Sequence, residues 1–162
     1  MSINTFWIWQ MSTYIIMTIS ENDAISDQSP LSPDQKWSEM NTKGGGVIMD
    51  FETWSSIPTL TDRIVIVISQ NPIDGHYHCT TIHEAIQQLS RICSNIYIVG
   101  DIYRQALLMK MVDGLVITRI HQQIQNADYV TLPLYKTLQW TSKIQLTQQI
   151  PFHYELYKIA RS

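Results

Sequence analysis

The chain has few charged residues, few cysteines and no long uninterrupted apolar run. Charged residues make up 15% of its 162 residues, and the net charge is −3. Because no run of Lys or Arg is present to follow a phosphate backbone, we expect no nucleic-acid partner. The apolar stretch near the N-terminus is interrupted by Gln10, Ser12 and Thr13. It is shorter than the roughly 20 apolar residues that a transmembrane helix needs, so no membrane span is predicted.

The two cysteines, Cys79 and Cys93, lack the spacing of a metal site or of a redox pair. Thiols of this kind are usual in a reducing cytosol, so we expect a cytoplasmic protein without a disulfide. His76, His78 and His83 lie near Cys79 in the sequence. Their spacing matches no common zinc pattern, and no metal site is predicted.

The length allows one domain with a sizeable core. We expect an N-terminal extension over residues 1–11 and a single domain over residues 12–162. Met1–Gln10 contains the aromatic run Phe6–Trp9. This run is interpreted either as an arm that packs on the domain or as an exposed patch that docks a protein partner or a membrane surface.

Strand and helix patterns alternate along the domain, without internal repeats or low-complexity segments. The predicted strands cover residues 13–19, 47–49, 64–68, 96–99 and 115–120. The predicted helices cover about residues 32–42, 51–57, 81–93 and 102–108. Residues 143–147 and 152–159 are typical of a closing hairpin. The five consecutive β-branched residues of 64–68 predict a central parallel strand covered on both faces. Together the pattern predicts an α/β domain with a mixed sheet flanked by helices.

Local signals mark the ends of the first two helices. Ser32 followed by Pro33 is typical of a helix start, and Gly44–Gly46 is typical of a helix stop. No Lys-Ser/Thr pair follows these glycines, as a P-loop would require. Asp50 stands where its carboxylate can cap the helix predicted over residues 51–57.

Seven short motifs, taken in order, resemble those of dihydrofolate reductases over about residues 12–161. The motifs are L-S-P-D-Q-K-W, V-I-M-x-x-x-T-W-x-S-I-P, L-T-D-R, H-E-A-I, I-Y-I-V-G, I-Y-R-Q-A-L and V-I-T-R-I. The resemblance implies the dihydrofolate reductase-like α/β fold, a mixed and mostly parallel central sheet that ends in an antiparallel hairpin. It also implies reduction of 7,8-dihydrofolate to tetrahydrofolate with NADPH.

The resemblance assigns a role to each residue of the substrate side. Asp34 matches the carboxylate that bonds the pterin ring and assists its protonation, a role that burial favours by raising a carboxyl pKa. Thr118 matches the threonine that links this acid to a pterin-bound water. Arg63 matches the arginine that pairs with the glutamate carboxylate of folate. The residues that match pocket-lining positions are Ile16, Ser56, Ile57, Leu60 and Val99.

The cofactor side matches the family less well. The residues that match cofactor-binding positions are Thr53, Ser69, Gly100 and Tyr103. However, Asp50-Phe51-Glu52 stands where the family has Gly-Arg, and Asp101 follows Gly100 where the family has a second glycine. Glycine and arginine suit a phosphate, whereas acids repel it, including the 2′-phosphate that distinguishes NADPH from NADH. We therefore expect weak or altered NADPH binding, with NADH as an alternative cofactor.

Two loops are also shorter than in the family. One follows Ile25 and normally closes over the nicotinamide, and the other is the hairpin turn at Gln148–Pro151 that packs against it. On the substrate side, Trp37 stands one position earlier than the family's aromatic residue. Two hypotheses follow: a divergent dihydrofolate reductase, or a catalytically inactive dihydrofolate reductase-like protein with a binding or structural role.

Overall fold

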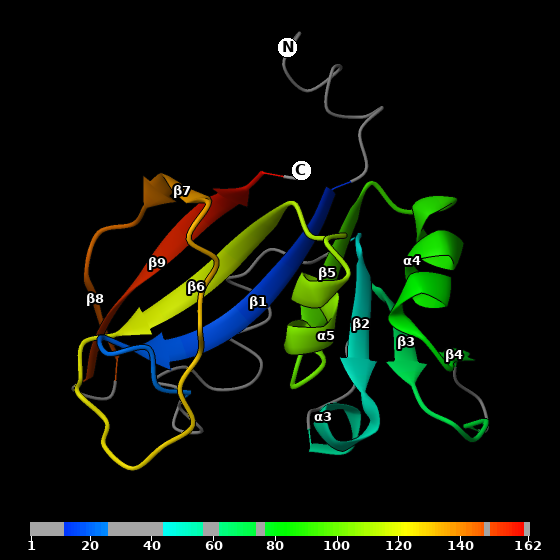
Figure 1. Cartoon of the computed structure of the whole chain (residues 1–162), viewed down its shortest axis with the longest axis horizontal. Coiled ribbons are helices and arrows are strands. Elements are labelled where there is room, and N and C mark those ends of the chain that lie inside the picture. The colour runs from blue at the N-terminus through cyan, green and yellow to red at the C-terminus, as the bar shows by residue number, and fades with distance from the viewer. Residues whose placement is uncertain (1–11, 26–43, 57–61, 74–76, 148–149, 161–162) are drawn as a thin grey trace, which may run out of the picture.

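A computed structural model describes residues 12–25, 44–56, 62–73, 77–147 and 150–160 of the chain. The predicted extension over residues 1–11 and the helix predicted over about residues 32–42 lie outside these ranges. Figure 1 shows a broad twisted sheet with short helices packed against it. Within the described ranges, no helix is long and apolar enough to cross a membrane.

Nine strands of the described chain form one mixed sheet. They are β1 (Ser12–Ser20), β2 (Gly46–Asp50), β3 (Ile64–Ile68), β4 (Tyr77–Cys79), β5 (Asn95–Val99), β6 (Gly114–Ile120), β7 (Lys136–Thr141), β8 (Gln145–Thr147) and β9 (Ile150–Ile159). The order is β4-β3-β2-β5-β1-β6-β9-β7, and β8 also pairs with β9. The strands from β4 to β6 in this order pair in parallel, whereas β9 is antiparallel to β6, β7 and β8. The predicted mostly parallel sheet with a closing antiparallel hairpin is confirmed.

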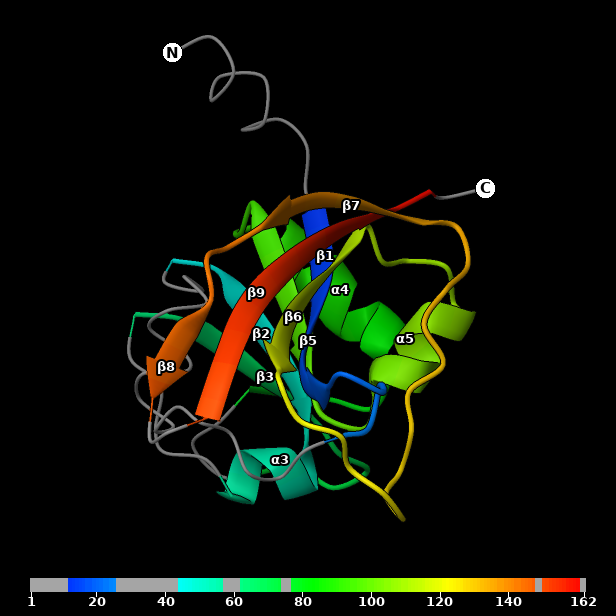
Figure 2. The ribbon, with the colours of Figure 1, turned by 90° about the vertical axis from the view of Figure 1, so that its left-hand side faces the viewer.

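Three helices of the described chain connect these strands: α3 (Phe51–Ser56), α4 (Ile82–Ser90) and α5 (Tyr103–Leu108). The side chain of Thr81 caps α4, because its hydroxyl oxygen accepts a hydrogen bond from the Glu84 N–H at 3.2 Å. Figure 2 shows α4 and α5 on the same side of the sheet, with α3 near the ends of β2 and β3.

The sheet has two apolar faces, because successive side chains of a strand point to opposite sides. On the α4–α5 face, Ile15 and Ile19 of β1 belong to the large core cluster that includes the buried side of α4. The opposite side is called the α3 face, since Trp54 of α3 packs on it. Its buried residues are Ile16, Val47, Met49, Tyr97 and Val99. The two faces therefore separate a helix-covered core from a second apolar surface.

The prediction that residues 64–68 form a central strand was wrong in its position. β3 is parallel to both neighbours, but only the three-residue β4 lies beyond it. Ile66 packs into the cluster of the α4–α5 face, while Val65 packs against the α3 face. A β-branched run thus indicates that a strand packs on both faces, but it does not predict how many strands lie to each side.

The sequence pattern did not predict β4 and β7. β4 contributes only three residues to the sheet, too few for a pattern to develop. β7 is an edge strand whose Leu138 and Trp140 are exposed, so it lacks the alternation of a half-buried strand. Both strands depend on pairing with a longer neighbour, β3 and β9 respectively.

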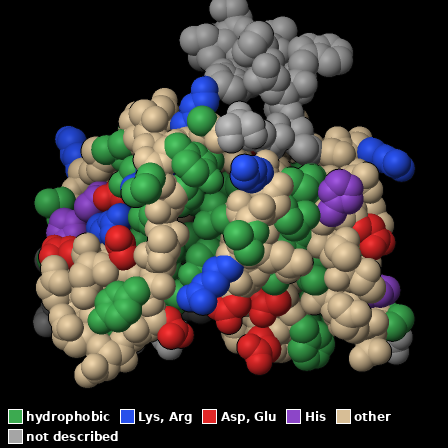
Figure 3. Space-filling view, in the orientation of Figure 1, with side chains coloured by type: hydrophobic (Ala, Val, Ile, Leu, Met, Phe, Trp, Pro, Cys, Tyr) green, Lys and Arg blue, Asp and Glu red, His purple; other side chains and the backbone are tan. Residues whose placement is uncertain are grey.

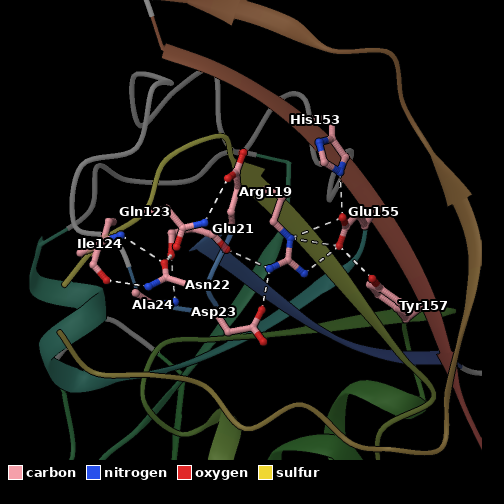
Figure 4. A network of polar contacts seen from close by, with 11 residues as sticks. Glu21, Asn22, Asp23, Ala24, Arg119, Gln123, Ile124, His153, Glu155 and Tyr157 are labelled. Carbon is pink, nitrogen blue, oxygen red and sulfur yellow. Dashed lines mark hydrogen bonds and ion pairs between the residues drawn. The ribbon is translucent and has the colours of Figure 1, made fainter. Parts of the chain in front are cut away.

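Arg119 of β6 joins three parts of the chain through its guanidinium group (Figure 4). Nη1 donates to the Ser20 carbonyl at 2.9 Å and pairs with Asp23 at 2.6 Å. Nη2 pairs with Glu155 of β9 at 3.0 Å. Since only 12% of the Arg119 side chain is exposed, both ion pairs are partly shielded from solvent. The end of β1 and the turn that follows it are thereby held against β6 and β9.

Further polar contacts surround the Glu155 carboxylate. His153 Nε2 lies 2.7 Å from it, and the Tyr157 hydroxyl donates to it at 3.0 Å. The other ring nitrogen of His153 lies 2.6 Å from His121 Nε2. Burial alone would raise the pKa of Glu155, but the hydrogen bonds from Arg119 and His153 lower it below its ordinary value. The carboxylate therefore stays charged and remains a partner for Arg119.

We predict that Arg119→Met destabilises the fold by about 3 kcal/mol, because it leaves a partly buried carboxylate without its cation. For a domain of this size the melting temperature should fall by about 6–12 °C, measured by differential scanning fluorimetry. The exposed Arg91 after α4 offers a matched control, Arg91→Met. Equal melting temperatures for the two variants would show that the Arg119 contacts do not stabilise the protein.

Candidate functional site

The carboxyl ends of the parallel strands bring several of the candidate residues together. Sheet register places Met49 beside Val99, and Val99 beside Ile16 on the other side. Asp50 and Gly100, the next residues along their chains, therefore lie at the same edge of the sheet. Such edges are where ligands bind in open α/β sheets. The α3 face at this edge is the candidate site.

On the substrate side, Ile16, Val99 and Val116 form an apolar row across three neighbouring strands. Thr118 lies two residues beyond Val116 on β6, on the same face of the sheet. Its side chain is 0% exposed, and its hydroxyl has no hydrogen-bond partner in the described part of the chain. A buried hydroxyl thus lies next to an apolar surface.

The other residues predicted on the substrate side are not grouped with these by the described part of the structure. Asp34, Ile57 and Leu60 lie outside the described residues. Arg63 directly precedes β3 and is half-buried, at the end of the sheet opposite to Val99. Ser56 is the last residue of α3 and is exposed, and its hydroxyl donates to the Thr53 carbonyl at 2.9 Å. The described residues therefore group Ile16, Val99 and Thr118, whereas Arg63 lies at the other end of the strands and Ser56 bonds within α3.

Two tyrosines extend the α3 face toward the opposite end of the strands. The rings of Tyr14 and Tyr97 stack with centroids 5.8 Å apart and an angle of 22° between planes. Burial raises the pKa of Tyr97, and the adjacent Tyr14 raises it further. Tyr97 therefore stays neutral, and the apolar character of this face continues along the strands.

On the cofactor side, the Asp50 carboxylate binds the donors of Thr53. The Thr53 hydroxyl donates to one carboxylate oxygen at 2.6 Å, and the Thr53 N–H donates to the other at 3.3 Å. The prediction that Asp50 caps α3 is confirmed. Gly100 lies directly against this pair with φ +96°, and a Cβ at Gly100 would overlap the Asp50 carboxylate and the Thr53 hydroxyl.

These contacts do not suit a phosphate group. An acid of the chain already occupies the Thr53 donors, and Glu52 and Asp101 are exposed nearby in sequence. Figure 3 shows acidic side chains gathered on the part of the surface that carries α3. Since like charges repel, a phosphate-bearing cofactor is disfavoured where the resemblance places it. The residues present do not fit the phosphates of NADPH in the way the family holds them.

The other two cofactor-side predictions have local partners. Tyr103 is buried in the cluster of the α4–α5 face, and its hydroxyl accepts from Arg104 Nε at 2.8 Å. The Ser69 hydroxyl donates to the Asn71 carbonyl at 2.9 Å and accepts from the Asn71 N–H at 3.2 Å. The Tyr103 N–H donates to the Gly100 carbonyl at 3.1 Å, but the Tyr103 side chain lies on the α4–α5 face, so among the described side chains predicted on this side only that of Thr53 lies against Gly100.

One residue that the sequence analysis missed lies beside Thr118. Thr18 of β1 pairs with Thr118 in the parallel register, and its hydroxyl is also buried without a partner in the described chain. Its position within the apolar first strand gave no signal, because threonine is common in strands. The contacts of Arg119 were missed as well, since Asp23 and Glu155 are far from it in sequence.

Comparisons with known proteins agree with this architecture. The family model described as "Dihydrofolate reductase" matches residues 13–158. A solved structure of Schistosoma mansoni dihydrofolate reductase superposes with a TM-score of 0.76 at 20% sequence identity. The match covers 93% of this chain and 100% of that one. No curated protein sequence matches the chain.

We predict that Gly100→Ala destabilises the protein by about 2–4 kcal/mol, because backbone strain adds to overlap with Asp50 and Thr53. Gly44→Ala is the matched control, since Gly44 has φ +78° but nothing within 4 Å of an added Cβ. It tests strain alone and should cost about 1 kcal/mol. Equal losses of unfolding free energy in urea for the two variants would contradict the close packing at Gly100.

Proposed function

This chain is a member of the dihydrofolate reductase family, and we propose that it is a divergent dihydrofolate reductase. Its reaction would be the reduction of 7,8-dihydrofolate to tetrahydrofolate, with weak use of NADPH or NADH. The observation that carries the proposal is the buried Thr118 hydroxyl, which lies without a described partner beside the apolar row of Ile16, Val99 and Val116.

The proposal for the substrate side follows from the chemistry of this surface. A pterin is a flat heteroaromatic ring with a polar edge, so it suits an apolar floor with a hydroxyl at its border. Leaving a hydroxyl buried without a partner costs about 1–3 kcal/mol, and a ligand that bonds it recovers part of this free energy. In this proposal Asp34 is the proton partner of the pterin, and Arg63 binds the carboxylate of the glutamate tail.

The proposal for the cofactor side is weak binding. The Asp50 carboxylate holds both Thr53 donors, which removes them from a ligand phosphate. The negative charge of Asp50 also opposes a second anion in the same place. We therefore expect little preference for NADPH over NADH.

A second candidate function is a catalytically inactive relative that still binds folates. The same Asp50–Thr53 contact favours it, because a protein that no longer uses the cofactor loses nothing when its own acid occupies the site. The two candidates share the folate side and differ in whether any nicotinamide cofactor is used.

Ligand titration separates the two candidates. Purified protein is titrated with methotrexate, NADPH and NADH while tryptophan fluorescence and melting temperature are followed. A ligand at 100 times its dissociation constant stabilises the fold by about 2.7 kcal/mol. Binding of methotrexate together with either nicotinamide cofactor supports the reductase, and binding of methotrexate alone supports the inactive relative. An absence of any shift rules out the reductase and a folate-binding relative, and it leaves an inactive relative with a structural role.

We predict that Asp34→Asn lowers dihydrofolate turnover by at least about 100-fold, because the amide cannot supply the proton that a carboxylic acid provides. Turnover is measured as the loss of absorbance of the reduced cofactor. Glu52→Gln, a change of the same kind on the exposed surface of α3, is the control and should leave substrate turnover above that of Asp34→Asn. Full turnover in Asp34→Asn would remove Asp34 from its proposed role.

We predict that Asp50→Asn strengthens NADPH binding by about tenfold, corresponding to roughly 1.4 kcal/mol. Asparagine caps a helix as well as aspartate does, so α3 should keep its start while the negative charge beside Gly100 is lost. The dissociation constant is measured by fluorescence titration, with melting temperature as a check on the fold. Unchanged NADPH affinity in a stable variant would mean that Asp50 does not oppose the cofactor.

A further inference from the structure

Thr18 and Thr118 form a pair of buried hydroxyl groups on the α3 face. The two residues are partners in the register of β1 with β6, so their side chains share one face on strands about 4.8 Å apart. Thr18 is 6% exposed and Thr118 is 0% exposed. Neither hydroxyl has a hydrogen-bond partner in the described part of the chain.

Apolar residues border this hydroxyl pair on the sheet. Ile16 precedes Thr18 by two residues and Val116 precedes Thr118 by two, so both lie on the same face. Ile16 also pairs with Val99 at the end of β5. The pair therefore lies at the edge of the apolar surface to which the proposed function assigns the pterin ring.

Each hydroxyl can donate one hydrogen bond and accept two. Two of them side by side can bond neighbouring polar atoms along one edge of a flat ring. An aminopyrimidine edge has this chemistry, because its amino groups donate and its ring nitrogens accept. Valine would fill nearly the same volume without an unsatisfied hydroxyl, so threonine at both positions costs free energy that a ligand bonding these hydroxyls would recover in part.

We propose that Thr18 is a further substrate-binding and specificity-determining residue, which together with Thr118 bonds the polar edge of the pterin ring. This inference rests on the proposed function, since it places the ring on the α3 face. Thr18 supplies a hydroxyl where an apolar side chain could provide only contact. A site built to bond a polar ring edge discriminates against rings that lack those polar atoms.

Thr13 provides a matched control on the same strand. Its hydroxyl is also buried without a partner in the described chain. Thr13 is separated from Thr18 by an odd number of positions and points to the opposite face of the sheet, the α4–α5 face. Thr13→Val thus removes an equivalent hydroxyl away from the candidate site.

The test compares the wild-type chain with Thr18→Val, Thr18→Ser and Thr13→Val. Dissociation constants for 7,8-dihydrofolate and methotrexate are measured by fluorescence titration, and melting temperatures are measured without ligand. We expect Thr18→Val to bind both ligands about tenfold more weakly, the value of one good hydrogen bond. Thr18→Ser, which keeps the hydroxyl, should bind within about threefold of wild type.

The melting temperatures distinguish a ligand-binding role from a structural one. Thr18→Val and Thr13→Val should each melt at or above the wild-type temperature, because each removes an unsatisfied buried hydroxyl.

Ligand affinity in Thr18→Val equal to that of wild type would overturn the inference and leave the proposed function standing. Equal weakening in Thr13→Val would overturn it too, since the effect would then be general. Failure of the wild-type chain to bind either ligand would overturn the proposed function, and this inference with it. If Thr18→Val does not fold, Thr18 serves the stability of the fold, and the inference that it serves to bind the ligand is overturned.

Discussion

The parallel pairing of β1 between β5 and β6 is the constraint on which the rest of the structure depends. It sets, residue by residue, which side chains enter the helix-covered core and which lie on the α3 face. A shift of one residue would exchange the two sets, placing Ile15 where Ile16 now lies and Met17 where Thr18 now lies. Burial of the isoleucines on the α4–α5 face makes that shift costly. The positions of Thr18 and Thr118 on the site face are therefore a consequence of the core.

The two sides of the candidate site differ in how their polar groups are satisfied. On the cofactor side, the chain bonds its own donors, because the Asp50 carboxylate accepts from both the hydroxyl and the N–H of Thr53. On the substrate side, the hydroxyls of Thr18 and Thr118 have no partner among the described residues. Unpartnered buried groups favour a ligand, whereas groups already bonded within the chain do not. This contrast supports the proposal of a protein that binds folates better than nicotinamide cofactors.

Long and strongly patterned elements could be predicted from the sequence. The β-branched run of 64–68, the helix pattern of 81–93 and the strand pattern of 115–120 each carry a local signal that tertiary structure did not override. Asp50 as the cap of α3 also follows from local chemistry. β4 and β7 could not be predicted, because their stability comes from a neighbouring strand rather than from their own residues. The position of β3 next to the edge strand β4 was not predictable either, because the composition of a strand does not tell how many strands lie beyond it.

By itself, the sequence determined the family, the kinds of element and the acids that stand in place of a phosphate-binding pair, since each depends on residue identity and short-range order. Only the tertiary structure decided how those residues are used. It placed the Asp50 carboxylate and the Thr53 hydroxyl, which are bonded to each other, directly against Gly100. It also brought Thr18 to Thr118 across a separation of 100 residues in the chain. Strand register, which depends on packing across the whole sheet, is the physical reason that neither contact could be read from local sequence.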